Sequence, residues 1–300
     1  MPHMLDLMAK ANRPIQFYGK VIDQNNNPIP DVKVNLSIKL IKAPRPGMFP
    51  GDMFDDYTLT TDTDGFFSLT DAKGELLTMR SLEKPGYEMS QQTVNKGYWY
   101  WASPGAEYVP DPNKPEIFEM WKEAGAEQLV RNSISFGLSY NGTPAGFDLM
   151  TGSQANPGDL RVTLLRDPQQ LAFGQRNYEW TATIEIPDGG LIASNDDQMY
   201  LAPAGGYQSQ LVIQMPPNTP GWTDHKDVAL YLKLRGGKYY GRANLKFIVG
   251  AHRANTPFYI ISYINPSGSR NLEPPPAPPP PPPLTNPVQQ PIIYNGSIGP

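Results

Sequence analysis

The stretch Asp31–Leu40, with the sequence DVKVNLSIKL, decides the fold class of this chain. Its apolar residues stand at every second position, and mostly polar residues fill the positions between them. Successive side chains of a β-strand point to opposite faces, so this pattern predicts a strand with one buried face and one solvated face. The apolar row consists of Val32, Val34, Leu36, Ile38 and Leu40.

The same two-residue period continues on both sides of this strand. A preceding strand is expected around Phe17–Ile22, and further strands flank the sequence TDTDG at residues 61–65. Within that sequence, Asp64-Gly65 predicts the turn of a β-hairpin, because glycine adopts a positive φ without a Cβ clash.

The second half of the chain shows the same alternation of apolar and polar residues as the first half, but its sequence is different. Gly236-Gly237 separates two long alternating rows by two residues, which predicts a second hairpin. The run Phe258–Ile264 is apolar on both faces apart from Ser262, and it predicts a last strand that is covered on both sides. Other alternating rows begin at Leu160, Trp180, Leu211 and Val228.

One segment fits two structures. Pro115–Glu127 reads PEIFEMWKEAGAE, and its apolar residues match the spacing of a helix as well as that of a strand. We favour a strand through about Lys122, because the surrounding sequence is β throughout, and helix stays open as the alternative.

Composition excludes several classes of protein. The 300 residues include no cysteine and three histidines, so disulfides, thiolate zinc sites and a cysteine nucleophile are excluded. The net charge of −4 gives no basis for a nucleic-acid surface. No apolar run approaches the roughly 18 residues of a membrane span. We therefore expect no cofactor, no nucleic acid and no transmembrane segment.

The two ends of the chain differ from its middle. Pro274–Pro283 contains nine prolines, which fix φ and remove amide donors, so a polyproline II helix of about 3.1 Å per residue is expected. Leu284–Pro300 is expected to be disordered. Residues 1–14 suggest a short amphipathic helix, and they lack the apolar core of a secretory signal. A cytoplasmic location therefore stays open.

Three short stretches, taken in order, resemble the carboxypeptidase regulatory-like domain family. They are FYGKVIDQNNNPIPDVKV at Phe17–Val34, TTDTDGFFSL at Thr60–Leu69 and KPGYE at Lys84–Glu88. The resemblance implies a transthyretin-like β-sandwich for the first domain. It also implies a non-catalytic module, because the family lacks the zinc site of the peptidase domain after which it is named.

The rest of the ordered chain resembles the partner region of larger bacterial envelope proteins that carry this domain. Three sequences carry that likeness: GDLR at 158–161, GKYYGR at 237–242 and NPSGSRNLE at 265–273. Together these observations predict an all-β chain with two tandem antiparallel β-sandwiches of immunoglobulin-like style. The expected segments are a helical piece at 1–14, the first sandwich at 15–127, the second at 128–273 and the proline-rich tail at 274–300.

The densest aromatic cluster is the candidate ligand-binding site. Consecutive aromatics on a strand point to both faces, so two of the four are exposed or are covered by another element. Packing between the two domains and a stacking platform for a polysaccharide or protein partner are both open. The cluster consists of Tyr98, Trp99, Tyr100 and Trp101.

Other candidate sites have simpler structural interpretations. Asp62 and Asp64 resemble part of a calcium loop, but its closing glutamate is absent, so a turn in which aspartate caps amides is favoured. Ser139 lies in a near match to a hydrolase nucleophile elbow, which requires a following helix that the pattern lacks. Enzymatic function is therefore not expected.

The stretch Asn265–Glu273 predicts a terminal clasp behind the last strand. Its asparagine and serine side chains are expected to satisfy backbone groups, and Arg270 is expected to pair with a carboxylate. Gly65, Gly236, Gly237, Arg270 and Asn271 are accordingly assigned structural roles. The predicted function is a structural or partner-binding role, with the envelope or extracellular location coming from the resemblance, and with a carbohydrate-binding protein or a hydrolase as alternatives.

Overall fold

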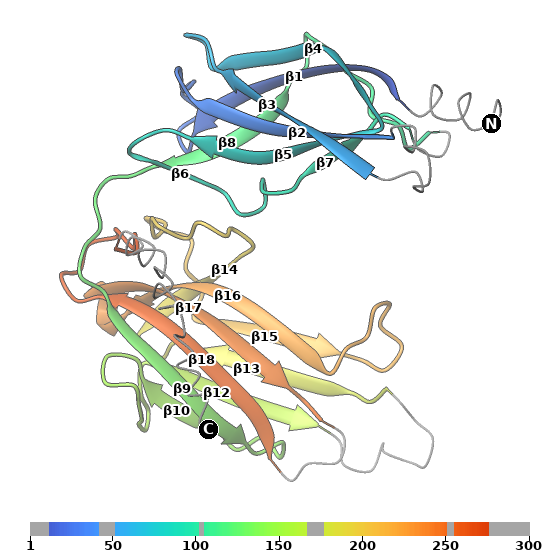
Figure 1. Cartoon of the computed structure of the whole chain (residues 1–300). Helices are drawn as coiled ribbons and strands as arrows, with labels where there is room; N and C mark the ends of the chain where they lie inside the picture. Colours follow the sequence, from blue (N-terminus) through green and yellow to red (C-terminus); the bar gives the residue numbers. More distant parts are fainter. Residues whose placement is uncertain (1–11, 42–51, 102–104, 167–176, 251–254, 276–300) are drawn as a thin grey trace, which may run out of the picture.

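The computed structural model describes residues 12–41, 52–101, 105–166, 177–250 and 255–275. Its described residues form an all-β structure of four sheets, packed as two β-sandwiches (Figure 1). The only helical element among them is the 3-10 turn η2 at Arg235–Gly237. No helix in the described ranges is long and apolar enough to span a membrane.

The N-terminal sandwich pairs two four-stranded sheets. The order of the first sheet is β4 (Phe66–Gly74), β1 (Arg13–Asp23), β8 (Glu116–Lys122) and β6 (Tyr87–Met89). The order of the second sheet is β3 (Asp52–Thr60), β2 (Lys33–Ile41), β5 (Leu76–Glu83) and β7 (Gly97–Trp99).

The C-terminal sandwich pairs two five-stranded sheets. One has the order β14 (Gly189–Ser194), β16 (His225–Leu234), β17 (Tyr239–Ile248), β18 (Thr256–Asn265) and β9 (Val130–Leu138). The other has the order β11 (Ser153–Gln154), β10 (Ala145–Asp148), β12 (Leu160–Arg166), β13 (Trp180–Glu185) and β15 (Gln210–Met215).

Each sandwich has its own core, built from the alternating rows. In β2, Val34, Leu36 and Ile38 are buried, and they face Phe17 and Phe118 of the opposite sheet in one apolar cluster. A second cluster fills the C-terminal sandwich, where the largest fully buried side chain is that of Trp180. The two-residue period therefore identifies the core faces of both sandwiches.

The strand prediction for the ambiguous segment is confirmed. Residues Glu116–Lys122 form β8, whose side chains at Phe118 and Met120 are buried. The antiparallel prediction is wrong for this one strand, because β8 runs parallel to β1, with Gly19 opposite Glu116. A parallel partner requires a long crossover, and the chain between β1 and β8 provides it, because it forms the second sheet as well as β4 and β6 of the first sheet.

The two predicted hairpins have different outcomes. The Gly236-Gly237 hairpin is confirmed, since β16 and β17 pair antiparallel around it with Leu234 opposite Tyr239. The Asp64-Gly65 hairpin is wrong as a strand pairing, because β3 pairs with β2 while β4 pairs with β1 in the facing sheet.

Gly65 still makes a tight turn where the chain passes between the sheets. Its φ is 77°, and its carbonyl accepts a hydrogen bond of 2.9 Å from Val21 N. A Cβ at this position would lie 2.5 Å from the Val21 carbonyl oxygen. The glycine is therefore required by the conformation and by the close approach to β1.

Two further expectations concern the ends of the chain, namely the helix at residues 1–14 and the proline-rich tail at residues 274–300. Arg13 and Pro14 are the first residues of β1, so the predicted helix does not extend over them. Residues 1–11 of that segment and the tail from Pro276 onward lie outside the described residues.

We predict that neighbouring positions of β18 differ sharply in their effect on stability. Phe258 is fully buried and Tyr259 is 40% exposed. Phe258→Ala should lower the free energy of unfolding by about 3–5 kcal/mol, and Tyr259→Ala should change it by less than about 0.5 kcal/mol. Urea unfolding of both variants measures this, and similar losses would contradict the assigned core face.

Candidate functional site

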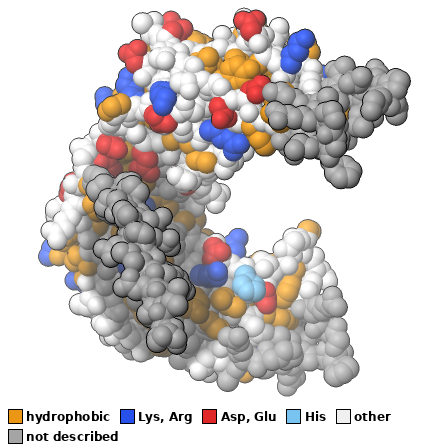
Figure 2. All heavy atoms as spheres, viewed as in Figure 1, with side chains coloured by type: hydrophobic (Ala, Val, Ile, Leu, Met, Phe, Trp, Pro, Cys, Tyr) orange, Lys and Arg blue, Asp and Glu red, His pale blue; other side chains and the backbone are white. Residues whose placement is uncertain are grey.

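The two sandwiches meet at a polar junction along one side (Figure 1), and an open cleft separates them on the other side (Figure 2). Four segments build the junction from both sandwiches. They are residues 88–92 at the end of β6 and after it, residues 121–129 at the end of β8 and in the linker to β9, the loop at 195–200 after β14, and residues 265–273 at the end of β18 and after it.

Glu273 is the central acceptor of the junction. Its side chain is buried, and its carboxylate accepts hydrogen bonds from Trp121 Nε1 at 2.6 Å, from Ala124 N at 2.8 Å and from Gly125 N at 2.8 Å. These donors belong to the end of β8 and to the linker. A buried carboxylate with three N–H donors is a strong, charge-assisted contact, so it fixes the linker against the end of the C-terminal sandwich.

A second set of contacts joins the loops of the two sandwiches. Tyr200 donates through its hydroxyl to Glu88 Oε1 at 2.8 Å, and burial followed by this hydrogen bond raises the pKa of Tyr200. Asp197 accepts from Ser90 Oγ at 2.9 Å and from Gln92 N at 3.2 Å. The N-terminal sandwich is thus held at two separate points.

The segment predicted as a terminal clasp binds a carboxylate of the linker, Glu127, through asparagine and serine side chains that were expected to satisfy backbone groups. Glu127 accepts hydrogen bonds from Asn265 Nδ2 at 3.0 Å, Ser267 Oγ at 2.9 Å and Ser269 Oγ at 2.7 Å. The bonds from Asn265, Ser269 and Ser267 lower the pKa of Glu127.

The two residues singled out within the clasp act on backbone carbonyls. Asn271 donates to Gly125 O at 2.6 Å, as expected of a structural amide. Arg270 donates to Ala202 O at 3.1 Å, so the expected carboxylate pair is replaced, within the described part of the chain, by a carbonyl contact.

A groove of about 830 Å³ begins at the junction and runs over the outer face of β16, β17, β18 and β9. Tyr259 and Ile261 of β18 line it with 40% and 37% of their surfaces exposed. The last strand is therefore covered on one face only, and the prediction that both faces are covered is wrong. The polar lining comes from Ser133, Ser194, Asn195, Asp196, Asp227, Asn244 and Lys246.

Part of this outer face is nevertheless covered. Met199, Ala202 and Leu272 pack with Tyr231 into a small apolar cluster near the junction. The groove is the part of the face that this cluster leaves uncovered, and Asn195 and Asp196 of the loop after β14 line part of it. This division explains why an apolar strand pattern alone does not reveal where the surface is open.

The aromatic cluster lies in and around β7 of the N-terminal sandwich. Tyr98 and Tyr100 are buried in the core, where the ring of Tyr98 packs against that of Phe17 at a tilt of 59°, with 4.7 Å between the ring centroids. Trp99 and Trp101 are exposed by 45% and 39%. Because the side chains alternate between the two faces, only Trp99 and Trp101 are exposed to a ligand. A ligand-binding role for this stretch stays a prediction.

The side chain of Asp62 is engaged in its own turn. Its Oδ1 accepts from Asp64 N and from Phe66 N, both at 2.9 Å. No group of three or more potential metal ligands is assembled in the described portion of the chain. The observed contacts are those of an aspartate that caps amides, as the turn interpretation expects.

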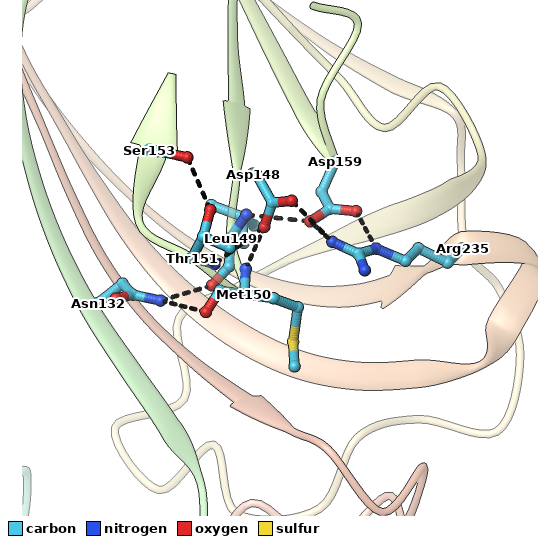
Figure 3. Close-up of polar contacts among 8 residues, drawn as sticks. All are labelled: Asn132, Asp148, Leu149, Met150, Thr151, Ser153, Asp159 and Arg235. Carbon is cyan, nitrogen blue, oxygen red and sulfur yellow. Dashed lines mark hydrogen bonds and ion pairs between the residues drawn. The ribbon is translucent and has the colours of Figure 1, made fainter. Parts of the chain in front are cut away.

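A polar cluster that sequence reasoning missed ties the two sheets of the C-terminal sandwich together (Figure 3). Arg235, at the hairpin turn, donates through Nε to Asp159 at 2.8 Å and through Nη2 to Asp148 at 3.1 Å. Burial alone would raise the pKa of Asp148, but hydrogen bonds from Thr151 N and Met150 N and the charge of Arg235 lower it.

The signal for this cluster was present in the sequence but divided between two motifs. Asp159 lies in the quoted GDLR stretch, and Arg235 immediately precedes Gly236-Gly237. The pairing joins residues that are 76 positions apart, so no local pattern predicts it. Its geometry is that of a structural clamp between a hairpin and the facing sheet.

The segment around Ser139 does not form a nucleophile elbow. Strand β9 ends at Leu138, and the chain bends through Tyr140 and Asn141 into β10. An elbow requires a strand-to-helix turn, which this segment does not make. The geometry gives the hydrolase alternative no support.

Comparisons with known proteins find little similarity. No family model matches the chain, and no curated protein matches it. Among solved structures, the chain is similar to a streptococcal ancillary pilin, with 12% identity and a TM-score of 0.24, over 74% of this chain and 53% of the pilin chain. The chain therefore spans about half the length of that pilin, and this degree of likeness carries no argument about function.

We predict that the clasp contributes a pH-dependent part of the stability. The pKa of Glu127 is lowered in the folded state from its ordinary value of 4.5, so its contribution is full above that value. The contribution is lost as the pH falls through the lowered pKa. Glu127→Gln should therefore be less stable than the wild type at neutral pH, and the difference should shrink at an acid pH at which Glu127 is protonated in the folded state as well.

Urea unfolding at both pH values measures the effect. The exposed linker residue Glu123 supplies the control variant Glu123→Gln, which should match the wild type at both values. A deficit of Glu127→Gln that stays constant with pH would contradict an ionised clasp.

Proposed function

We propose that this chain is a non-catalytic module of the cell envelope or the extracellular space. Its role is to hold two β-sandwiches at a fixed angle and to present the groove beside the junction to a protein partner. The observation that carries this proposal is the junction itself, where Glu273 engages three N–H donors from the other side of the boundary. Preorganised surfaces bind with a smaller entropy cost than mobile ones.

We further propose that residues 15–127 form a domain of the carboxypeptidase regulatory-like kind and that residues 128–273 form the second domain. The three quoted stretches support this, since they fall on β1 to β2, on the Gly65 turn into β4 and on the start of β6. The hydrophobic clusters also support it, because one draws its buried members from Ile15 to Met120 and the other from Leu138 to Ile264.

A partner-binding role is supported by the composition of the groove. Exposed apolar side chains at Tyr259 and Ile261 are flanked by the charged side chains of Asp196, Asp227 and Lys246. Protein interfaces have this arrangement, with an apolar centre and a polar rim. The location in the envelope rests on the family resemblance.

We predict a characteristic labelling pattern for two single-cysteine variants of the full chain. The natural sequence has no cysteine, so each variant carries one reactive thiol. Val109 is 80% exposed and lies away from the groove, whereas Ile261 lies inside it. On intact cells, a membrane-impermeant maleimide should label Val109→Cys at least several-fold more than Ile261→Cys.

In the purified protein, both thiols should react at comparable rates. Reaction of Val109→Cys only after lysis would contradict the surface location. Equal labelling of both variants on intact cells would contradict a partner in the groove. The cysteine-free wild type supplies the background.

A further inference from the structure

A second pocket, on the junction itself, is lined by the last described residues of the chain. It has a volume of about 580 Å³, and Pro274 and Pro275 form part of its wall. This pocket is separate from the groove over β18 and shares no lining residue with it. The other lining residues are Glu88, Trp121, Glu123, Gly125, Ala126, Tyr200 and Glu273.

Two aromatic rings from different sandwiches stand at this pocket. Trp121 and Tyr200 make an edge-to-face pair, with 5.6 Å between ring centroids and an angle of 88°. Both polar ends are engaged, since Trp121 Nε1 donates to Glu273 and the Tyr200 hydroxyl donates to Glu88. These hydrogen bonds fix the orientation of both rings, and the apolar faces of the rings line the pocket.

The direction in which the tail leaves the fold is also fixed. Leu272 N donates to Tyr200 O at 2.7 Å, and Glu273 N donates to Asn271 Oδ1 at 2.9 Å. With the Glu273 carboxylate held as well, the backbone reaches Pro274 from an anchored position against the pocket. The described chain ends at Pro275, and 276–284 continues it with the sequence PAPPPPPPL.

A polyproline II helix fits an aromatic-lined pocket for physical reasons. It has no internal hydrogen bonds and little conformational freedom to lose, and it presents ring faces that pack on aromatic side chains. One turn takes three residues and rises about 9 Å. Pro276 follows directly on Pro275, which lines the pocket, so the proline segment begins beside the two aromatic rings.

We propose that the Trp121–Tyr200 pocket is an intramolecular polyproline-binding site whose occupant is the segment 276–283 of the same chain. The tail then lies against the junction and covers the edge where the two sandwiches meet. This inference is independent of the proposed partner in the groove, because it concerns the isolated chain and a different pocket.

The test compares the purified full chain with a tail variant in which every proline from position 276 to 283 is replaced by serine. Pro274 and Pro275 remain, so the wall of the pocket is unchanged. The signal is the indole N–H of Trp121 in a nitrogen–proton correlation spectrum, assigned through Trp121→Phe. In the tail variant this signal should shift, and its hydrogen exchange should become several-fold faster.

Two controls make the result specific. The indole N–H of Trp180, which donates to Thr223 O in the C-terminal sandwich, should be unchanged. Serine at Pro287 and Pro291, outside the proline run, should leave Trp121 as in the wild type. Identical Trp121 signals in the wild type and the tail variant would overturn the proposal. So would changes confined to Tyr259 and Ile261, because they would place the tail in the groove instead.

Discussion

The buried carboxylate of Glu273 is the contact that joins the end of the N-terminal sandwich and the linker to the C-terminal sandwich. Two β-sandwiches in tandem keep a fixed relative orientation only when contacts span their boundary. Inter-domain contacts within a chain are commonly small and polar. Here one carboxylate gathers the indole of Trp121 and the amides of Ala124 and Gly125, so the linker itself becomes part of the C-terminal sandwich. The Glu88–Tyr200 contact adds a second point of attachment, which restricts rotation about the first.

Much of the fold could be predicted from the sequence, because burial on a sheet face leaves a two-residue period. That period identified the buried row of β2, and Gly236-Gly237 identified a hairpin, because both signals are local. The turn at Gly65 was recognised as well, but turn chemistry does not say which sheet the next strand joins, so its pairing was wrong. The parallel β1–β8 pair was missed for the same reason, since it depends on distant residues.

The candidate site was less predictable, because its contacts join residues that are far apart in the sequence. Trp121 and Glu273 are separated by 152 positions, and neither is unusual in its local pattern. The unusual composition of Asn265–Glu273 did indicate a clasp, although its carboxylate, Glu127, lies in the linker. The open face of β18 was predicted to be covered, because apolar residues on both faces of a strand are typical of a buried one. The junction, the open groove and the proline-rich segment that follows the junction are the features on which the proposed structural role rests.

A fixed position of the groove relative to the N-terminal sandwich requires that the two sandwiches behave as one rigid unit. Nitroxide labels at Ser68→Cys on β4 and Gln214→Cys on β15 would report on it, because both positions are exposed and the natural chain has no cysteine. Pulsed electron–electron spin resonance should give a single narrow distance distribution for the doubly labelled chain and a clearly broader one when Glu273→Ala is added. A broad distribution in the presence of Glu273, or one that Glu273→Ala leaves unchanged, would contradict the account.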